Sequence, residues 1–424
     1  MFHSQFTLLE TRRFLPLFLT QTLGAFNDNL FKNALVVLIT FVLAEQSGMD
    51  ASLLVTAAAG IFILPFLLFS ALAGQIADKY DKSRIIRIVK LVEILLMCGA
   101  ALGFYLQSVP VLMLLLFLMG AQSAFFGPLK YGILPDHLHR DELIGGNGLI
   151  QAATFLAILL GTLAGGLLIL AWKGTFIISI LIIGVAVVGW FCSRYIPATR
   201  PASALLDINP NIVSETWKII RYTAQRKEIF APIIAISWFW LVGATFLAQV
   251  PTFGKVALGG DESLVTLLLL VFSVGIGIGS MLCNRMLKGE VHASYVPYGA
   301  LALSVFAVDL YFATHQVVAP GSGEPISAML FMEHLPNWRI LMDFMLIAVS
   351  GGIYIVPLNA MVQARSEPSH RARNISAVNI LNALFMVASA IASALLLSQG
   401  FSVSQIFLCL AVLNMGAAYY TYKL

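Results

Sequence analysis

The sequence has few charged residues. Asp, Glu, Lys and Arg make up 11% of the 424 residues, whereas 59% are hydrophobic and the mean hydropathy is +0.89. Soluble domains are typically about 25% charged, so this chain has too little charge to form a water-facing surface over its whole length. The composition excludes a soluble globular protein and indicates a polytopic membrane protein whose surface mostly contacts lipid.

Residue patterns for enzyme chemistry are also missing. The four cysteines, Cys98, Cys192, Cys283 and Cys409, lie in four separate hydrophobic segments, without a CxxC pair or a histidine at metal-ligand spacing. None of the seven histidines forms an HExxH motif, and the sequence contains neither a nucleophile elbow nor a phosphate-binding loop. We therefore predict no enzymatic activity, no cofactor, no bound metal and no nucleic-acid partner.

What the sequence does contain is a series of hydrophobic runs. Each is about 20 residues or longer, which is the length a helix needs to cross a bilayer. We expect about twelve spans, at residues 14–44, 51–77, 85–106, 110–134, 148–172, 175–196, 229–254, 263–283, 294–314, 338–362, 375–398 and 402–422. The first run is too long and too polar at its centre for a cleaved signal peptide. The predicted fold class is all-α integral membrane.

Lys and Arg are unevenly distributed among the segments that join these runs. If the N-terminus is cytoplasmic, most of the 25 Lys and Arg residues fall on the cytoplasmic side, notably in the stretches 79–87 and 194–227. Cytoplasmic loops of membrane proteins carry an excess of these residues. The pattern predicts that both termini are cytoplasmic.

The longest polar segment divides the chain into two sets of six spans. We predict an N-terminal six-helix bundle at residues 1–196, a cytoplasmic linker at 197–228 and a C-terminal six-helix bundle at 229–424. Within the linker, Asn209-Pro210 indicates a helix start. An apolar stripe follows it, made of Val213, Trp217, Ile220 and Ala224. Such a helix either lies on the inner membrane surface or joins the two bundles, and the sequence is compatible with both.

The centre of the first span carries polar and charged residues. Asp28, Asn29 and Lys32 lie there, on or beside one helical stripe. A charge at the centre of a membrane helix costs roughly 2.5–3.5 kcal/mol on insertion scales, so such residues usually have a function. We predict that this helix face is water-accessible. In the competing interpretation, Asp28 and Lys32 only neutralise each other, and Asn29 joins neighbouring helices.

The loop after the second span resembles a motif of the major facilitator superfamily. It reads from Gly74 to Arg84 as GQIADKYDKSR, with Asp78 four residues after Gly74 and basic residues following. The resemblance implies two six-helix bundles and a gate formed by Gly74, Asp78, Lys82 and Arg84. In this gate, Asp78 holds a partner helix end or a basic side chain in one conformer and releases it in another. In the alternative view, the basic residues only fix the topology.

Within that superfamily the chain is similar to the bacterial lysophospholipid transporters. The matching stretches are residues 25–29, 126–134, 145–149 and 356–360, in the same order along the chain. The resemblance implies import of lysophosphatidylethanolamine and lysophosphatidylglycerol from the outer to the inner leaflet of a bacterial inner membrane. It also implies a partner that re-acylates the lipid, namely an acyltransferase with an acyl-carrier-protein synthetase, either separate or fused.

The same resemblance implies a central cavity lined by spans one, four, seven and ten. In it, Asp28 would bind the ammonium group of a phospholipid headgroup and Lys130 its phosphate. The other residues expected there are Asn29, Lys32, Trp240, Gln249 and Asn359. Structural roles are the alternatives: Lys130 extends to the membrane interface, and Trp240 packs between helices.

Two other functions are compatible with the sequence. One is a proton-coupled antiporter that exports drugs or amphiphiles, with Asp28 as the proton carrier. The other is a membrane anchor that only docks acyltransferase enzymes.

Overall fold

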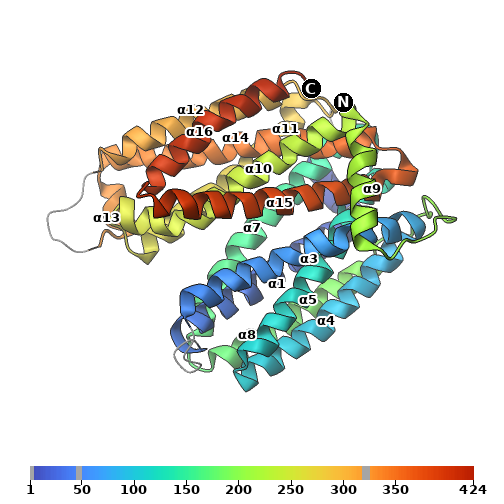
Figure 1. Cartoon of the computed structure of the whole chain (residues 1–424), viewed down its shortest axis with the longest axis horizontal. Coiled ribbons are helices and arrows are strands. Elements are labelled where there is room, and N and C mark those ends of the chain that lie inside the picture. Colours follow the sequence, from blue (N-terminus) through green and yellow to red (C-terminus); the bar gives the residue numbers. More distant parts are fainter. Residues whose placement is uncertain (1–3, 44–49, 318–324) are drawn as a thin grey trace.

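The computed structural model describes residues 4–43, 50–317 and 325–424, and long helices dominate it (Figure 1). In this described part of the chain, six long helices precede the linker and six follow it. The first bundle consists of α1 (Leu15–Leu38), α3 (Ala51–Lys79), α4 (Lys82–Leu106), α5 (Val109–Gly132), α7 (Leu143–Ile169) and α8 (Gly174–Arg194). The second consists of α10 (Lys227–Thr252), α11 (Glu262–Leu287), α12 (Val296–Thr314), α14 (Leu335–Arg365), α15 (Arg371–Ser398) and α16 (Val403–Thr421). This architecture confirms the predicted all-α membrane fold.

Nearly all of these helices are long and apolar enough to cross a membrane. Eleven helical segments meet this description among the described residues. The remaining long helix, α4, carries Lys90 and Glu93, whose side chains form a buried ion pair with 2.6 Å between Nζ and Oε2. Pairing offsets part of the cost of placing each charge in apolar surroundings.

Local sequence explains where several helices begin. The side chains of Asp50, Asp81 and Asp261 accept hydrogen bonds from backbone N–H groups in the first turns of α3, α4 and α11. Such caps replace the intrahelical partners that a first turn lacks. The predicted fifth span starts at residue 148, but α7 already begins at Leu143, because a short helical turn, Arg140–Glu142, runs directly into it.

The two bundles converge at one end of the molecule and diverge toward the other (Figure 1). At the interface, α3 packs against α15 and α7 packs against α11. Glycine permits the close approach: a Cβ atom on Gly148 of α7 would lie 2.5 Å from the carbonyl oxygen of Ser280 in α11. The C-terminus lies at this converging end (Figure 1).

The linker helix α9 (Ile212–Ala224) crosses the converging end and contacts α3, α10 and α15 (Figure 1). Its buried residues are Glu215, Ile219 and Thr223. Most of the predicted apolar stripe faces outward instead, since Val213 and Trp217 are 80% and 67% exposed. Of the predicted stripe, Ile220 packs against the core, whereas Val213, Trp217 and Ala224 are exposed, so the stripe is not the main face that packs on the bundles.

Candidate functional site

A cavity of about 370 Å³ lies between the two bundles. Helices α1, α3, α4, α5, α7, α10, α14 and α15 contribute side chains to its wall. Of the predicted site residues, those that line it are Asp28, Asn29, Lys32, Lys130, Trp240 and Asn359. Aromatic side chains, including Phe62, Phe66 and Phe126, complete the wall. The cavity thus combines both signs of charge with an apolar surface, which is the composition of an amphiphile-binding site.

Gln249 does not line this cavity. It lies nine residues after Trp240 on α10. At about 100° per residue, this separation places the two side chains on opposite faces of the helix. The prediction that Gln249 lines the cavity is therefore wrong.

Asp28 is held by a hydroxyl group from another helix. Ser123 of α5 donates a hydrogen bond to Oδ2 of Asp28, with 2.6 Å between the oxygens. Asp28 and Lys32 form no ion pair in the described structure; instead, Nζ of Lys32 lies 5.2 Å from the ring centroid of Phe62. The two charges therefore do not neutralise each other by direct contact, and both remain available to a ligand in the cavity.

Asn29 and Asn33, on the same helix as Asp28, bind backbone groups. Asn29 donates to the carbonyl oxygen of Ala25 in its own helix at 2.8 Å. Asn33 donates to the carbonyl oxygen of Thr162 in α7 at 2.6 Å. Asn33 therefore joins two helices of the first bundle.

A buried polar cluster supports the wall behind Asp28. Glu93 accepts hydrogen bonds from Lys90 at 2.6 Å and from Asn27 and Gln122 at 3.1 Å each. Lys90 also lines the cavity, and its Nζ lies 4.8 Å from the ring centroid of Phe126. Sequence reasoning did not assign this cluster to the site, although charged residues in the middle of α4 were a visible signal.

Lys130 lies in the same cavity but farther along it. Ser123, which binds Asp28, and Lys130 are both on α5 and are seven residues apart, or about 10 Å along the helix axis. The Nζ atom of Lys130 lies 4.5 Å from the ring centroid of Tyr131. The structure therefore brings Asp28 and Lys130 into one cavity without joining them in an ion pair.

Amide side chains supply further ligand groups that sequence reasoning missed. Gln151 of α7 and Asn379 of α15 both line the cavity. The side-chain nitrogen of each is buried and has no hydrogen-bond partner in the described structure. An unpartnered buried donor is costly, so these two nitrogens favour a ligand that brings acceptor oxygens.

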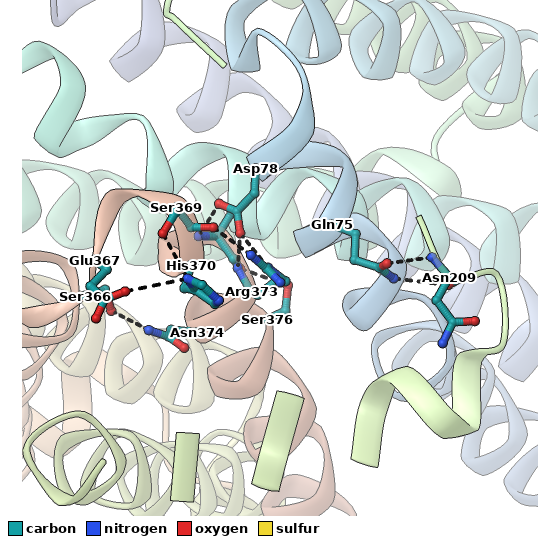
Figure 2. Close-up of polar contacts among 11 residues, drawn as sticks. Gln75, Asp78, Asn209, Ser366, Glu367, Ser369, His370, Arg373, Asn374 and Ser376 are labelled. Carbon is teal, nitrogen blue, oxygen red and sulfur yellow. Dashed lines mark hydrogen bonds and ion pairs between the residues drawn. The ribbon is translucent and has the colours of Figure 1, made fainter. Parts of the chain in front are cut away.

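Asp78 joins the two bundles at the converging end (Figure 2). It is fully buried, and its Oδ1 accepts from the backbone N–H of Ala372 at 3.0 Å. Its Oδ2 accepts from the Nε of Arg373 at 3.0 Å and from the backbone N–H of Arg373 at 3.3 Å. A carboxylate of the first bundle thus binds the N-terminus of α15, where the helix dipole is positive, together with a basic side chain.

Gly74 allows this contact because it has no side chain. A Cβ atom at this position would lie 2.9 Å from the Cα of Arg373 and would also collide with the hydroxyl of Ser376. Since Gly74 lies one turn before Asp78 on α3, any larger residue would push α15 away from the carboxylate.

A second ion-pair network crosses the same interface. The Oδ2 of Asp136, in the short helix α6 (Leu134–His137), accepts from Lys82 at 2.9 Å, and its Oδ1 accepts from Arg371 at 3.0 Å. Lys82 belongs to the first bundle and Arg371 to the second. Arg84 is exposed, and the described structure gives it no contact across the interface.

The linker is tied to the last turns of α3 and to the loop that follows this helix. The side chain of Gln75 and the backbone of Asn209 exchange two hydrogen bonds, at 2.8 and 3.1 Å (Figure 2). Thr199 donates its backbone N–H and its hydroxyl to Asp81. Burial opposes the charged form of Asp81, but the donors of Thr199 and Ser83 outweigh it and hold the pKa of this carboxyl below its usual value.

A pair of amides crosses the interface between α7 and α14. Asn147 donates to Oε1 of Gln363 at 2.8 Å, and Gln363 donates to Oδ1 of Asn147 at 2.9 Å. Both side chains are buried. Each amide satisfies the other, so the bundles are held together here without charge.

Comparison with known proteins places this geometry in a family. The Major Facilitator Superfamily profile matches residues 17–332. The lysophospholipid transporter LplT of Escherichia fergusonii is 27% identical over 392 residues, covering 88% of this chain and 86% of the relative. LplT of Klebsiella pneumoniae is 28% identical over 380 residues, covering 88% and 85%. These relatives are transporters, in agreement with the prediction of a protein without enzymatic activity.

Solved structures show the same fold at low sequence identity. The human organic anion transporter MFSD10 superposes with a TM-score of 0.77 at 12% identity, covering 97% of this chain and 99% of that one. A bacterial homologue of the iron transporter ferroportin, in an outward-facing state, gives a TM-score of 0.70 at 13% identity, covering 96% and 100%. This chain is a multi-pass membrane transporter that belongs to the Major Facilitator Superfamily and is similar to its lysophospholipid transporters.

Proposed function

We propose that this chain transports lysophospholipids from the outer to the inner leaflet of a bacterial inner membrane by alternating access. The observation that carries this proposal is the cavity between the bundles, which contains Asp28, Lys130 and a wall of aromatic side chains. A lysophospholipid has one acyl chain and a headgroup with a phosphate, so it presents the complementary groups.

The headgroup meets the two charges in sequence. Ser123, which binds Asp28, and Lys130 are seven residues apart on α5, so their backbone positions differ by roughly 10 Å along the helix axis, whereas phosphate and ammonium in phosphatidylethanolamine are a few ångströms apart. The ammonium group therefore binds Asp28 first, and the phosphate then moves to Lys130, where Gln151 and Asn379 supply N–H donors. Phe62, Phe66 and Phe126 contact the acyl chain.

The gate sets which leaflet the cavity faces. Both termini are cytoplasmic in this proposal, so the end closed by Asp78 and Asp136 is the cytoplasmic end. The conformer described here then receives cargo from the outer leaflet, and separation of Asp78 from α15 releases it inward. An acyltransferase with an acyl-carrier-protein synthetase re-acylates the product.

The test is uptake of radiolabelled lysophosphatidylethanolamine and lysophosphatidylglycerol into cells that depend on this chain. Lys130→Gln should lower uptake of both lipids at least about tenfold, because a hydrogen bond to a charged group contributes roughly 1.5–3 kcal/mol. Asp28→Asn should lower uptake of lysophosphatidylethanolamine more, since the glycerol headgroup has no ammonium. Exposed residues supply the matched controls, Asp207→Asn and Lys255→Gln, which should retain wild-type uptake.

An uncoupler of the proton gradient separates the competing functions. Uptake that persists with the uncoupler and is lost in Lys130→Gln supports the proposal. Efflux that the uncoupler abolishes would instead identify a proton-coupled antiporter. Absence of transport in wild-type protein that is present in the membrane would leave only the anchor function.

A further inference from the structure

A second hollow lies on the outer surface of the second bundle, at the converging end. It is a groove of about 610 Å³ between the last turns of α11 and the short N-terminal helix η1 (Gln5–Glu10). It shares no lining residue with the central cavity.

The wall of the groove toward the middle of the membrane is apolar and open. Phe6, Ile278 and Leu282 are 53%, 39% and 37% exposed. Ile278 and Leu282 are one turn apart on α11, which is long and apolar enough to cross the membrane. These side chains therefore face lipid tails, and the groove is open to an acyl chain of the bilayer.

The other end of the groove is basic. Arg285 lies in the last turn of α11 and Lys288 directly follows the helix, and both are exposed. Neither forms an ion pair in the described structure. The adjoining pocket contains Asp141 and Glu142, but Arg13 binds Glu142 with 2.5 Å between the atoms. Asp141 is thus the acidic side chain left opposite Arg285 and Lys288. A net positive charge remains at the level where phospholipid phosphates lie.

Gln5 links the groove to both bundles. Its Nε2 donates to the carbonyl oxygen of Met281 in α11 at 3.2 Å, and a Cβ atom on Gly145 of α7 would lie 2.9 Å from the Cβ of Gln5. Its Oε1 is buried without a hydrogen-bond partner in the described structure. An unpartnered acceptor that lines a basic groove suits a ligand with both a phosphate and a hydroxyl group.

We propose that this groove binds an anionic diacyl phospholipid of the surrounding leaflet, with its phosphate between Arg285 and Lys288. One acyl chain lies on the apolar wall, and a headgroup hydroxyl donates to Gln5. The lipid is a fixed component and not cargo. Because η1 contacts α7 and α11, the bound lipid stabilises the conformer in which the bundles converge at this end.

The test is thermal unfolding of the purified full chain in neutral detergent, with increasing phosphatidylglycerol. The unfolding midpoint should rise and saturate with phosphatidylglycerol, but not with phosphatidylcholine or with soluble glycerol phosphate, which has no tail. The variant R285Q/K288Q should need about 25-fold more phosphatidylglycerol, since each basic side chain near an anionic surface contributes roughly a fivefold factor. The control R221Q/K227Q removes two exposed charges from the same end of the molecule and should behave as wild type.

Native mass spectrometry gives an independent readout, because phosphatidylglycerol should stay bound to wild type and to the control but not to R285Q/K288Q. Phe6→Ser, which removes part of the apolar wall, should also weaken binding while leaving both cations in place. Equal stabilisation by phosphatidylcholine would overturn the proposal. So would unchanged lipid retention in R285Q/K288Q, or an equal loss in the control variant.

Discussion

Replacing Asp78 with Asn should shift the protein toward the conformer in which the bundles separate at the converging end. Asn keeps one acceptor oxygen but loses the charge that binds Arg373 and the N-terminus of α15. Hydrogen bonds to charged groups contribute roughly 1.5–3 kcal/mol. This loss corresponds to about a 10- to 150-fold shift in the equilibrium between the two conformers.

A buried cysteine at the interface reports this equilibrium. Ser376 is fully buried against Gly74, so a cysteine there reacts with a water-soluble maleimide only when the bundles separate. In a background without the four native cysteines, the labelling rate of Ser376→Cys should be at least about tenfold faster in Asp78→Asn, in proportion to the population shift.

Asp81→Asn is the matched control. It makes the same charge change three residues later, but Asp81 caps α4 and binds Thr199 of the linker, so it does not contact the second bundle. Its labelling rate should stay close to wild type. Equal rates in wild type and Asp78→Asn would refute the role of this carboxylate in holding the bundles together.

Two further substitutions test the same interface. Gly74→Ala brings a methyl group to 2.9 Å from the Cα of Arg373 and should also speed cysteine labelling, whereas Gly60→Ala on the same helix meets nothing within 4 Å and should not. Gln363→Ala leaves Oδ1 of Asn147 buried without its donor, while Nδ2 still donates to Leu143, and should lower the free energy of unfolding by about 1–3 kcal/mol. Adding Asn147→Ala should cost much less than the two single changes predict, and strict additivity in a double-mutant cycle would contradict direct coupling of these amides.

The fold could be predicted because its main signal is local. A run of about 20 apolar residues identifies a span by itself, and twelve such runs leave few alternatives to a helical membrane protein. The ends of the helices were less predictable. Helix α7 starts five residues before the predicted span because the turn Arg140–Glu142 continues into it. The outward face of α9 was not predictable from periodicity, since the partners that bury Ile219 come from distant segments.

The charged part of the candidate site was visible in the sequence because charge is unusual within a span. Asp28, Lys32 and Lys130 stand out for that reason, and all three line the cavity. The amides Gln151 and Asn379 did not stand out, because a single amide in a membrane helix is more often a packing contact. The prediction placed Gln249 in the cavity because it lies on the same helix as Trp240. The helical repeat, applied from Trp240 to Gln249, puts the two side chains on opposite faces of α10.

The partners of the gate residues could not be predicted from the sequence either. The spacing of Gly74 and Asp78 indicated a carboxylate that binds a helix end, but not which helix supplies that end. Asp136, which contacts Arg371 more than two hundred positions away, gave no signal at all. Contacts of this kind depend on how the bundles dock, which no local pattern encodes.

Asp136 forms one ion pair within its own bundle and one across the interface, so the two pairs respond differently when the bundles separate. When the bundles part, Arg371 leaves, but Lys82 stays with the carboxylate because both belong to the first bundle. The carboxylate of Asp136 therefore always keeps one cationic partner, and the guanidinium of Arg371, which is mostly buried in this interface, regains water when it leaves. An anion with one permanent and one exchangeable cation can be uncoupled and re-formed many times at small energetic expense, as each round of a transport cycle requires.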